Sequence, residues 1–272
     1  MDATLLLQMA ILLALIGAVA GVLAGLLGVG GGIVLVAAYF YGFQTLGFDG
    51  PGLMQICLAT SLATIVVTSA RSVMAHHARG AVMWDVLRGW SPGIALGAIL
   101  GVLVVARLSS DTLQVIFGGL ALAVGLYMAL GRRDWRLGTA LPGGVFRLIL
   151  SPVIGLLSVL MGIGGGSFGV PLMTLFSTPI HGAVATAAGF GAVIAVPSVL
   201  GFLLATPPGP VPPYTVGAVN LPAFALVISM TLITTPIGVR LAHGLDPRPL
   251  RRIFAAFLIL VALNMLRSAL WT

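Results

Sequence analysis

The chain has 272 residues, of which 59% are hydrophobic and only 7% are charged, and its mean hydropathy is +1.17. A soluble domain carries about a quarter charged residues, so this composition excludes a soluble protein and predicts an integral membrane protein. The net charge of +7 comes from Arg and Asp residues that lie mostly in short stretches between apolar runs. Basic residues in such a chain are typical of cytoplasmic loops, and without an aromatic-interleaved basic patch we expect no nucleic-acid partner.

Apolar runs of about 17 to 25 residues are long enough to cross a bilayer as helices. In chain order they cover residues 4–27, 55–75, 90–106, 113–130, 182–205, 219–239 and 253–271, and shorter runs resembling half-helices cover 32–43, 147–161 and 167–178. We interpret the first run as a retained helix and not a signal peptide, because its flank holds Asp2 and no Arg. The expected fold is all-α: a polytopic helical membrane protein with about 8–10 hydrophobic segments.

The placement of Arg orients these segments. Arg residues gather around residues 71–88, 131–147 and 240–252, whereas the loops at 44–54 and 206–218 have none. The positive-inside rule therefore places the Arg-bearing loops in the cytoplasm, although Arg107 and Arg267 each lie on the other side. Both termini then lie on the outer face if each glycine cluster described next joins a helical hairpin.

The two halves of the sequence repeat one plan. Residues 24–32, which end in Gly-Val-Gly-Gly-Gly, are echoed by residues 158–166, which end in Gly-Ile-Gly-Gly-Gly. Ala59-Thr60 matches Ala185-Thr186, and Gly80-Ala81-Val82 matches Gly217-Ala218-Val219. Equivalent loops differ in charge, which is the signature of an inverted repeat with an odd number of crossings per half. We predict a first repeat over 1–135 and a second over 136–272, each of five segments, two of which form the glycine hairpin.

Three consecutive glycines cost about 1 kcal/mol each against Ala inside a helix, so each cluster is expected to break its helix. Broken backbone inside a bilayer must be buried or line a polar cavity, and matching breaks in both halves point to a transporter's binding site. Half-helices that restart near Gly32 and Gly166 would direct positive dipole ends at that site, which favours an anion. The alternative is close helix packing by small residues. The substrate-binding candidates are Gly28, Gly30, Gly31, Gly32, Gly162, Gly164, Gly165 and Gly166.

Hydroxyl and cationic side chains add further candidates. The hydroxyls of Thr60, Ser61, Thr64 and Thr186 could bind an anion in a shared cavity, or could instead bond to backbone carbonyls of their own helices. Arg71, His76 and Arg79 are candidates for gating or anion attraction, although topology alone also explains cations at a cytoplasmic helix end.

The expected spans hold no Asp or Glu, so no carboxylate relay for proton coupling is visible in them. We find no nucleophile paired with a base and no metal-ligand pattern, so we expect no catalytic residues, no metal site, no cofactor and no enzymatic activity.

A resemblance to a known family rests on the two glycine clusters, the Val170-Pro171 that follows the second cluster, the Ala59-Thr60-Ser61 segment and the stretch from His76 to Trp84. In these features the sequence resembles the sulfite exporter TauE/SafE family of membrane transporters. The resemblance covers nearly the whole chain, with the departure that Ala37 replaces the Pro seen at Pro171 in the second copy. It implies secondary transport of sulfur-containing anions such as sulfite, thiosulfate or organosulfonates.

Our hypothesis is a multi-pass transporter of the plasma (inner) membrane that exports a small anion by alternating access at a midplane site between the hairpins. The alternatives are an anion channel with the same lining and a non-transporting membrane partner of a sulfur-metabolism complex. The expected partners are the small anionic substrate, the lipid bilayer and, in addition, further copies of the chain in a homo-oligomer.

Overall fold

The computed structural model describes residues 3–27, 31–131, 135–244 and 247–271. Over these residues the chain is almost wholly helical, with one short β-hairpin. The elements are α1 (Ala3–Leu27), α2 (Gly32–Thr45), α3 (Leu53–His77), α4 (Trp84–Val105), α5 (Ser110–Leu130), α6 (Gly144–Leu160), α7 (Gly166–Leu175), α8 (Ile180–Leu204), β1 (Thr215–Val216), β2 (Val219–Asn220), α9 (Leu221–Gly244) and α10 (Pro247–Trp271). The all-α prediction is confirmed, and each apolar run of the sequence corresponds to one helix.

Six of the described helices, α3, α4, α5, α8, α9 and α10, are long and apolar enough to cross a membrane. The helices α2 and α7 are not, because their 14 and 10 residues span about 21 and 15 Å at 1.5 Å per residue, against a hydrocarbon core of about 30 Å. Both short helices begin directly after a glycine cluster, as predicted. The second arm of each glycine hairpin is therefore too short to cross a membrane by itself.

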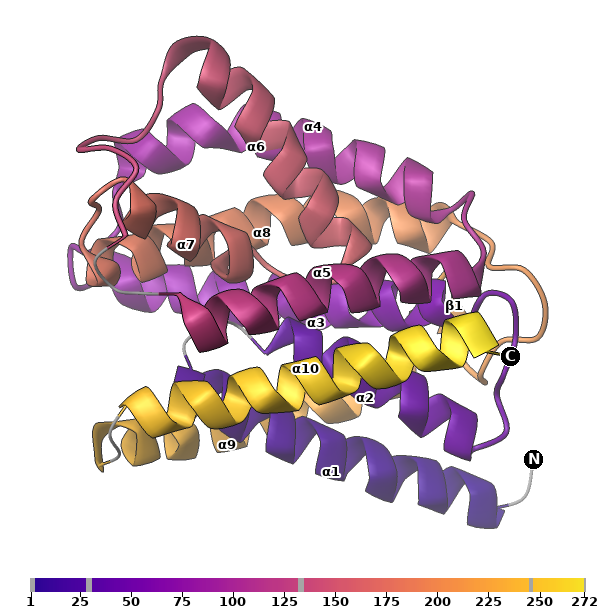
Figure 1. Cartoon of the computed structure of the whole chain (residues 1–272). Coiled ribbons are helices and arrows are strands. Elements are labelled where there is room, and N and C mark those ends of the chain that lie inside the picture. Colours follow the sequence, from indigo (N-terminus) through magenta and orange to yellow (C-terminus); the bar gives the residue numbers. More distant parts are fainter. Residues whose placement is uncertain (1–2, 28–30, 132–134, 245–246, 272) are drawn as a thin grey trace.

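The helices pack in pairs that combine the two halves of the chain (Figure 1). Helix α1 packs against α9 and α6 packs against α4, while α3 meets α8 and α5 meets α10. If α1–α5 correspond to α6–α10, each of these contacts has its counterpart in the other half. In Figure 1, α5 runs from right to left and α10 from left to right, and the chain both enters α1 and leaves α10 at the right-hand end. This antiparallel course is the arrangement of an inverted repeat.

The matched threonines of the repeat bind the helix entries of the opposite half. Thr60 Oγ1 accepts a hydrogen bond from the backbone N–H of Asn220 at 3.0 Å, and Thr186 Oγ1 accepts one from the N–H of Met83 at the same distance. Asn220 directly precedes α9, and Met83 directly precedes α4. Each threonine thus satisfies a donor at a helix start that would otherwise lack a partner inside the membrane.

Ser61 joins the two glycine hairpins. Its hydroxyl donates to the carbonyl of Gly162 at 2.7 Å and lies 3.4 Å from the carbonyl of Gly32. The two turns are in direct contact, because a Cβ atom on Gly32 would lie 3.0 Å from the Cα atom of Ile163. Ser61 is fully buried, so this one side chain satisfies backbone that the hairpins cannot satisfy alone.

We predict that Ser61→Ala destabilises the protein by about 1 to 3 kcal/mol, because the buried carbonyl of Gly162 loses its partner. Thermal unfolding of the detergent-solubilised protein measures this as a lower midpoint. Ser229→Ala is the matched control, since the Ser229 hydroxyl is exposed and bonds the carbonyl of Ala225 in its own helix. Equal midpoints for both variants would contradict a joining role for Ser61.

Candidate functional site

A cavity of about 390 Å³ lies between α3, α8 and α9 and reaches the glycine turns of both hairpins. Its walls are mixed, with apolar residues such as Ala20, Leu35, Ile65 and Leu232 beside a row of polar groups. The polar lining residues are Thr64, Thr68, Ser69, Arg71, Ser72 and His76 from α3 and Thr231 and Thr235 from α9. This volume is ample for a small anion with its water, whose share of liquid volume is about 30 Å³ per molecule.

The cavity opens toward the Arg-bearing end of the molecule. Along α3, the residues that line the cavity begin at Thr64 and continue to His76, near the end of the helix. Arg71 lies within this stretch, and its side chain is exposed. The preceding half of α3, from Leu53 to Ala63, is buried throughout. The positive-inside rule predicts that this open end faces the cytoplasm.

The floor of the cavity is formed by the glycine turns. Gly31, Gly164, Gly165 and Gly166 all line it. Gly31 precedes α2 with a φ of 64°, a left-handed backbone that glycine adopts without strain. The first N–H groups of α2 and α7 have no partner within their own helices. Both turns therefore present backbone donors and positive helix ends at the inner limit of the cavity.

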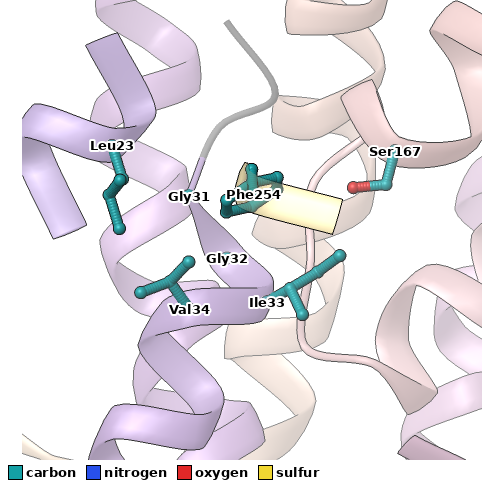
Figure 2. Close-up of a pocket in the computed structure, with 7 residues that line it drawn as sticks. All are labelled: Leu23, Gly31, Gly32, Ile33, Val34, Ser167 and Phe254. Carbon is teal, nitrogen blue, oxygen red and sulfur yellow. The ribbon is translucent and has the colours of Figure 1, made fainter. Parts of the chain in front are cut away.

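A small crevice lies beside the first glycine turn (Figure 2). Leu23, Gly31 and Phe254 surround it, and the Ser167 side chain of α7 directs its oxygen toward the same space. Its volume of about 10 Å³ is at the lower limit for a single water molecule. The crevice marks where the two hairpins and α10 meet, and only the larger cavity has room for an anion.

The electrostatics of the cavity favour a negative ligand. Among the described residues that line it there is no Asp or Glu, whereas Arg71 and His76 stand at its mouth. The side-chain oxygens of Thr64, Thr68 and Thr235 lie 3.1, 3.2 and 2.6 Å from carbonyl oxygens of their own helices. Each hydroxyl can rotate from that carbonyl to a bound anion. The cavity thus combines a guanidinium at its mouth, hydroxyls along its walls and the starts of α2 and α7 at its floor.

The residues predicted from sequence fall into three groups. The cavity is lined by Gly31, Thr64, Arg71, His76, Gly164, Gly165 and Gly166. A second group is buried outside the cavity lining: Gly32, Gly162 and the three hydroxyl residues Thr60, Ser61 and Thr186. These three hydroxyls form hydrogen bonds with backbone groups. Arg79 is exposed and does not line the cavity either. Gly28 and Gly30 lie outside the described residues.

Several lining hydroxyls were missed from sequence, namely those of Thr68, Ser69, Ser72, Thr231 and Thr235. A signal for some of them was present: Thr64, Thr68 and Ser72 recur every fourth residue and so share one face of α3. Thr231 and Thr235 have the same spacing on α9. Only the packing of α9 beside α3 brings the two faces to one cavity.

Comparisons with known proteins agree with this architecture. A family model described as "Sulfite exporter TauE/SafE" matches residues 13–265. A probable membrane transporter protein of Haemophilus influenzae is 32% identical over 252 residues, which cover 92% of this chain and 96% of that protein. A probable membrane transporter protein of Methanocaldococcus jannaschii is 26% identical over 94% of each chain. No solved structure matches the chain.

We predict that Gly165→Ala disrupts the second glycine turn. The added Cβ atom would overlap the carbonyl oxygen of Ala187 at 2.6 Å and the Phe190 side chain, so α8 and the turn would have to separate. Gly119→Ala is the control, because the Cβ atom there meets nothing within 4 Å. Thermal unfolding should show a lower midpoint for Gly165→Ala and an unchanged or higher one for Gly119→Ala, and the reverse order would refute the packing.

Proposed function

Since the chain belongs to the sulfite exporter TauE/SafE family of membrane transporters, we propose that it exports a small sulfur-containing anion, such as sulfite, thiosulfate or an organosulfonate. The substrate would occupy the floor of the inward-open cavity, between the two glycine hairpins, and cross by alternating access. The chain is a multi-pass protein of the plasma membrane, so transport would connect the cytoplasm with the outside.

The observation that carries this proposal is the chemistry of the cavity. An oxyanion needs several hydrogen-bond donors and a positive potential once it leaves water. Arg71 supplies a positive charge at the entrance and His76 a ring N–H, the hydroxyls of α3 and α9 line the walls, and the starts of α2 and α7 meet at the floor. A sulfonate or sulfite oxygen could therefore exchange its hydration for protein donors step by step along this path.

The paired packing indicates how access would alternate. On the closed side, α4 lies close along α8, whereas on the open side the equivalent helix α9 meets α3 less closely. Moving the α1–α9 pair toward α3 and the α4–α6 pair away from α8 would exchange these two arrangements. The inverted halves would then have swapped conformations, which closes the cytoplasmic opening and creates an outer one.

Export of an anion needs no buried carboxylate. The described Asp residues, Asp49, Asp85 and Asp111, are all exposed. A cell interior that is negative drives an anion outward with about 2.3 kcal/mol per charge for each 100 mV. The membrane potential alone can thus supply the driving force that a proton gradient supplies in proton-coupled transporters.

The decisive test is flux into liposomes that contain the purified protein. We expect saturable flux of sulfite, thiosulfate or a sulfonate, and we expect Arg71→Gln to raise the half-saturating concentration from the Arg-bearing face about tenfold, which corresponds to about 1.4 kcal/mol. Arg107→Gln is the matched control, because Arg107 is exposed at the opposite end. No flux of any of these anions would refute the proposal, and flux that rises linearly without saturation would indicate a channel.

A binding test is independent of transport. Anions that bind the folded state should raise the thermal midpoint of the solubilised protein. At an anion concentration a hundredfold above Kd, the free energy of unfolding increases by about 2.7 kcal/mol. We expect stabilisation by sulfite, thiosulfate or taurine but not by the matching concentration of chloride. Stabilisation by simple carboxylates alone would reject the sulfur-anion assignment.

A further inference from the structure

The two halves share one backbone plan but differ in chemistry along the two routes to the glycine turns. The Thr60–Asn220 and Thr186–Met83 hydrogen bonds align α3 with α8 and α9 with α4. With this alignment, the positions in α8 that correspond to Thr68, Ser69 and Arg71 of the cavity are occupied by Ile194, Ala195 and Pro197. Two hydroxyls and the guanidinium therefore have apolar counterparts, whereas Ser72 corresponds to another serine, Ser198.

The same contrast holds for the other wall. Thr231 and Thr235 of α9 line the cavity, and their counterparts in α4 are Ile94 and Ala98. The face of α9 that lines the cavity therefore carries hydroxyls, whereas the corresponding face of α4, on the closed side, is apolar. The difference extends across both walls of the pathway and is not a single substitution.

These counterparts are buried apolar residues of α4 and α8, two helices that pack against each other. Ile194, Ala195, Ile94 and Ala98 are all 0% exposed. A Cβ atom on Gly201, further along α8, would lie 2.8 Å from the Cβ-branched side chain of Val102 in α4, so the two helices touch without space for water. We define the outer gate as Ile94, Ala98, Ile194 and Ala195.

We propose that the anion-binding side chains of this transporter serve only its inward-open form, and that the outer gate opens onto an apolar vestibule that binds anions weakly. This inference rests on the proposed function and adds a direction to it. In the outward-open form the anion keeps the backbone donors of the glycine turns and the hydroxyl of Ser198, but it loses the guanidinium and the other wall hydroxyls. Release outward is therefore easy, and anion that accumulates outside leaves the carrier unoccupied and free to return.

The asymmetry changes the affinity of each face for the anion, and it does not change the equilibrium distribution of the anion across the membrane. A passive carrier moves its substrate down the electrochemical gradient whichever side binds more tightly, so the membrane potential still sets the net direction. What the apolar gate changes is the concentration at which each face saturates. The proposal is therefore a statement about half-saturating concentrations on the two sides.

The test measures saturation from each face of oriented liposomes. A Thr139→Cys variant carries its thiol in the exposed loop between α5 and α6, while the native Cys57 is fully buried. Labelling with a membrane-impermeant thiol reagent, before and after detergent is added, gives the fraction of each orientation. With sulfite as the probe, we expect the half-saturating concentration to be at least tenfold lower on the Arg-bearing face.

A graft provides the second measurement. Ile194→Thr combined with Ala195→Ser gives α8 the hydroxyls that α3 carries, and should lower the half-saturating concentration on the Arg-free face at least threefold while the other face is unaffected. Val196→Thr is the control, because it adds a hydroxyl to the exposed side of the same helix. Each added hydroxyl can bond a carbonyl one turn earlier, so the helix tolerates it.

The outcomes separate the two proposals. Unequal saturation that the graft reduces supports the asymmetric pathway. Saturable flux with equal half-saturating concentrations on the two faces overturns the asymmetry and leaves the transport function standing. Absence of flux from either face overturns the transport function, and the asymmetry with it.

Discussion

The structure depends on one constraint, which is that backbone N–H and C=O groups inside a bilayer must find partners within the protein. Each glycine cluster breaks this rule locally, because it interrupts a helix at membrane depth. The interruption is stable only where other elements surround it. Ser61 satisfies the carbonyl of the second turn, and α3 and α8 enclose both turns. The floor of the cavity is thus the same backbone that the rest of the fold is arranged to enclose.

The interleaved pairing of the halves follows from this constraint. A hairpin that ends inside the membrane cannot satisfy its own turn, so each half supplies groups to the other. Thr60 and Thr186 reach across to the helix entries of the opposite half, and Gly32 packs on the backbone of Ile163. Either half alone would leave these groups unpaired, which costs stability. The pairing also explains how two similar halves can form one site at their junction.

The cavity and the outer gate show how a duplicated backbone has acquired unequal faces. Exchange of the two packing arrangements between halves needs similar backbones, and the glycine turns preserve that similarity. In the proposed mechanism, substrate capture needs hydroxyls and a cation on one side only. Side chains such as Thr68 and Ile194 differ without disturbing the shared helix geometry, because both fit a helix of the same length and course.

The sequence by itself determined the number and type of segments, since apolar runs of given length and glycine breaks act locally and leave little choice in a membrane. It also indicated the antiparallel halves, because Arg placement is read loop by loop. It did not decide the roles of Thr60 and Thr186, whose hydroxyls looked available for an anion. Only the tertiary structure placed their backbone partners beside them, some 100 or more residues away in the chain. It also decided that Thr68 and Thr235 share a cavity, because that depends on which helices pack together, and helix packing is not encoded in either segment alone.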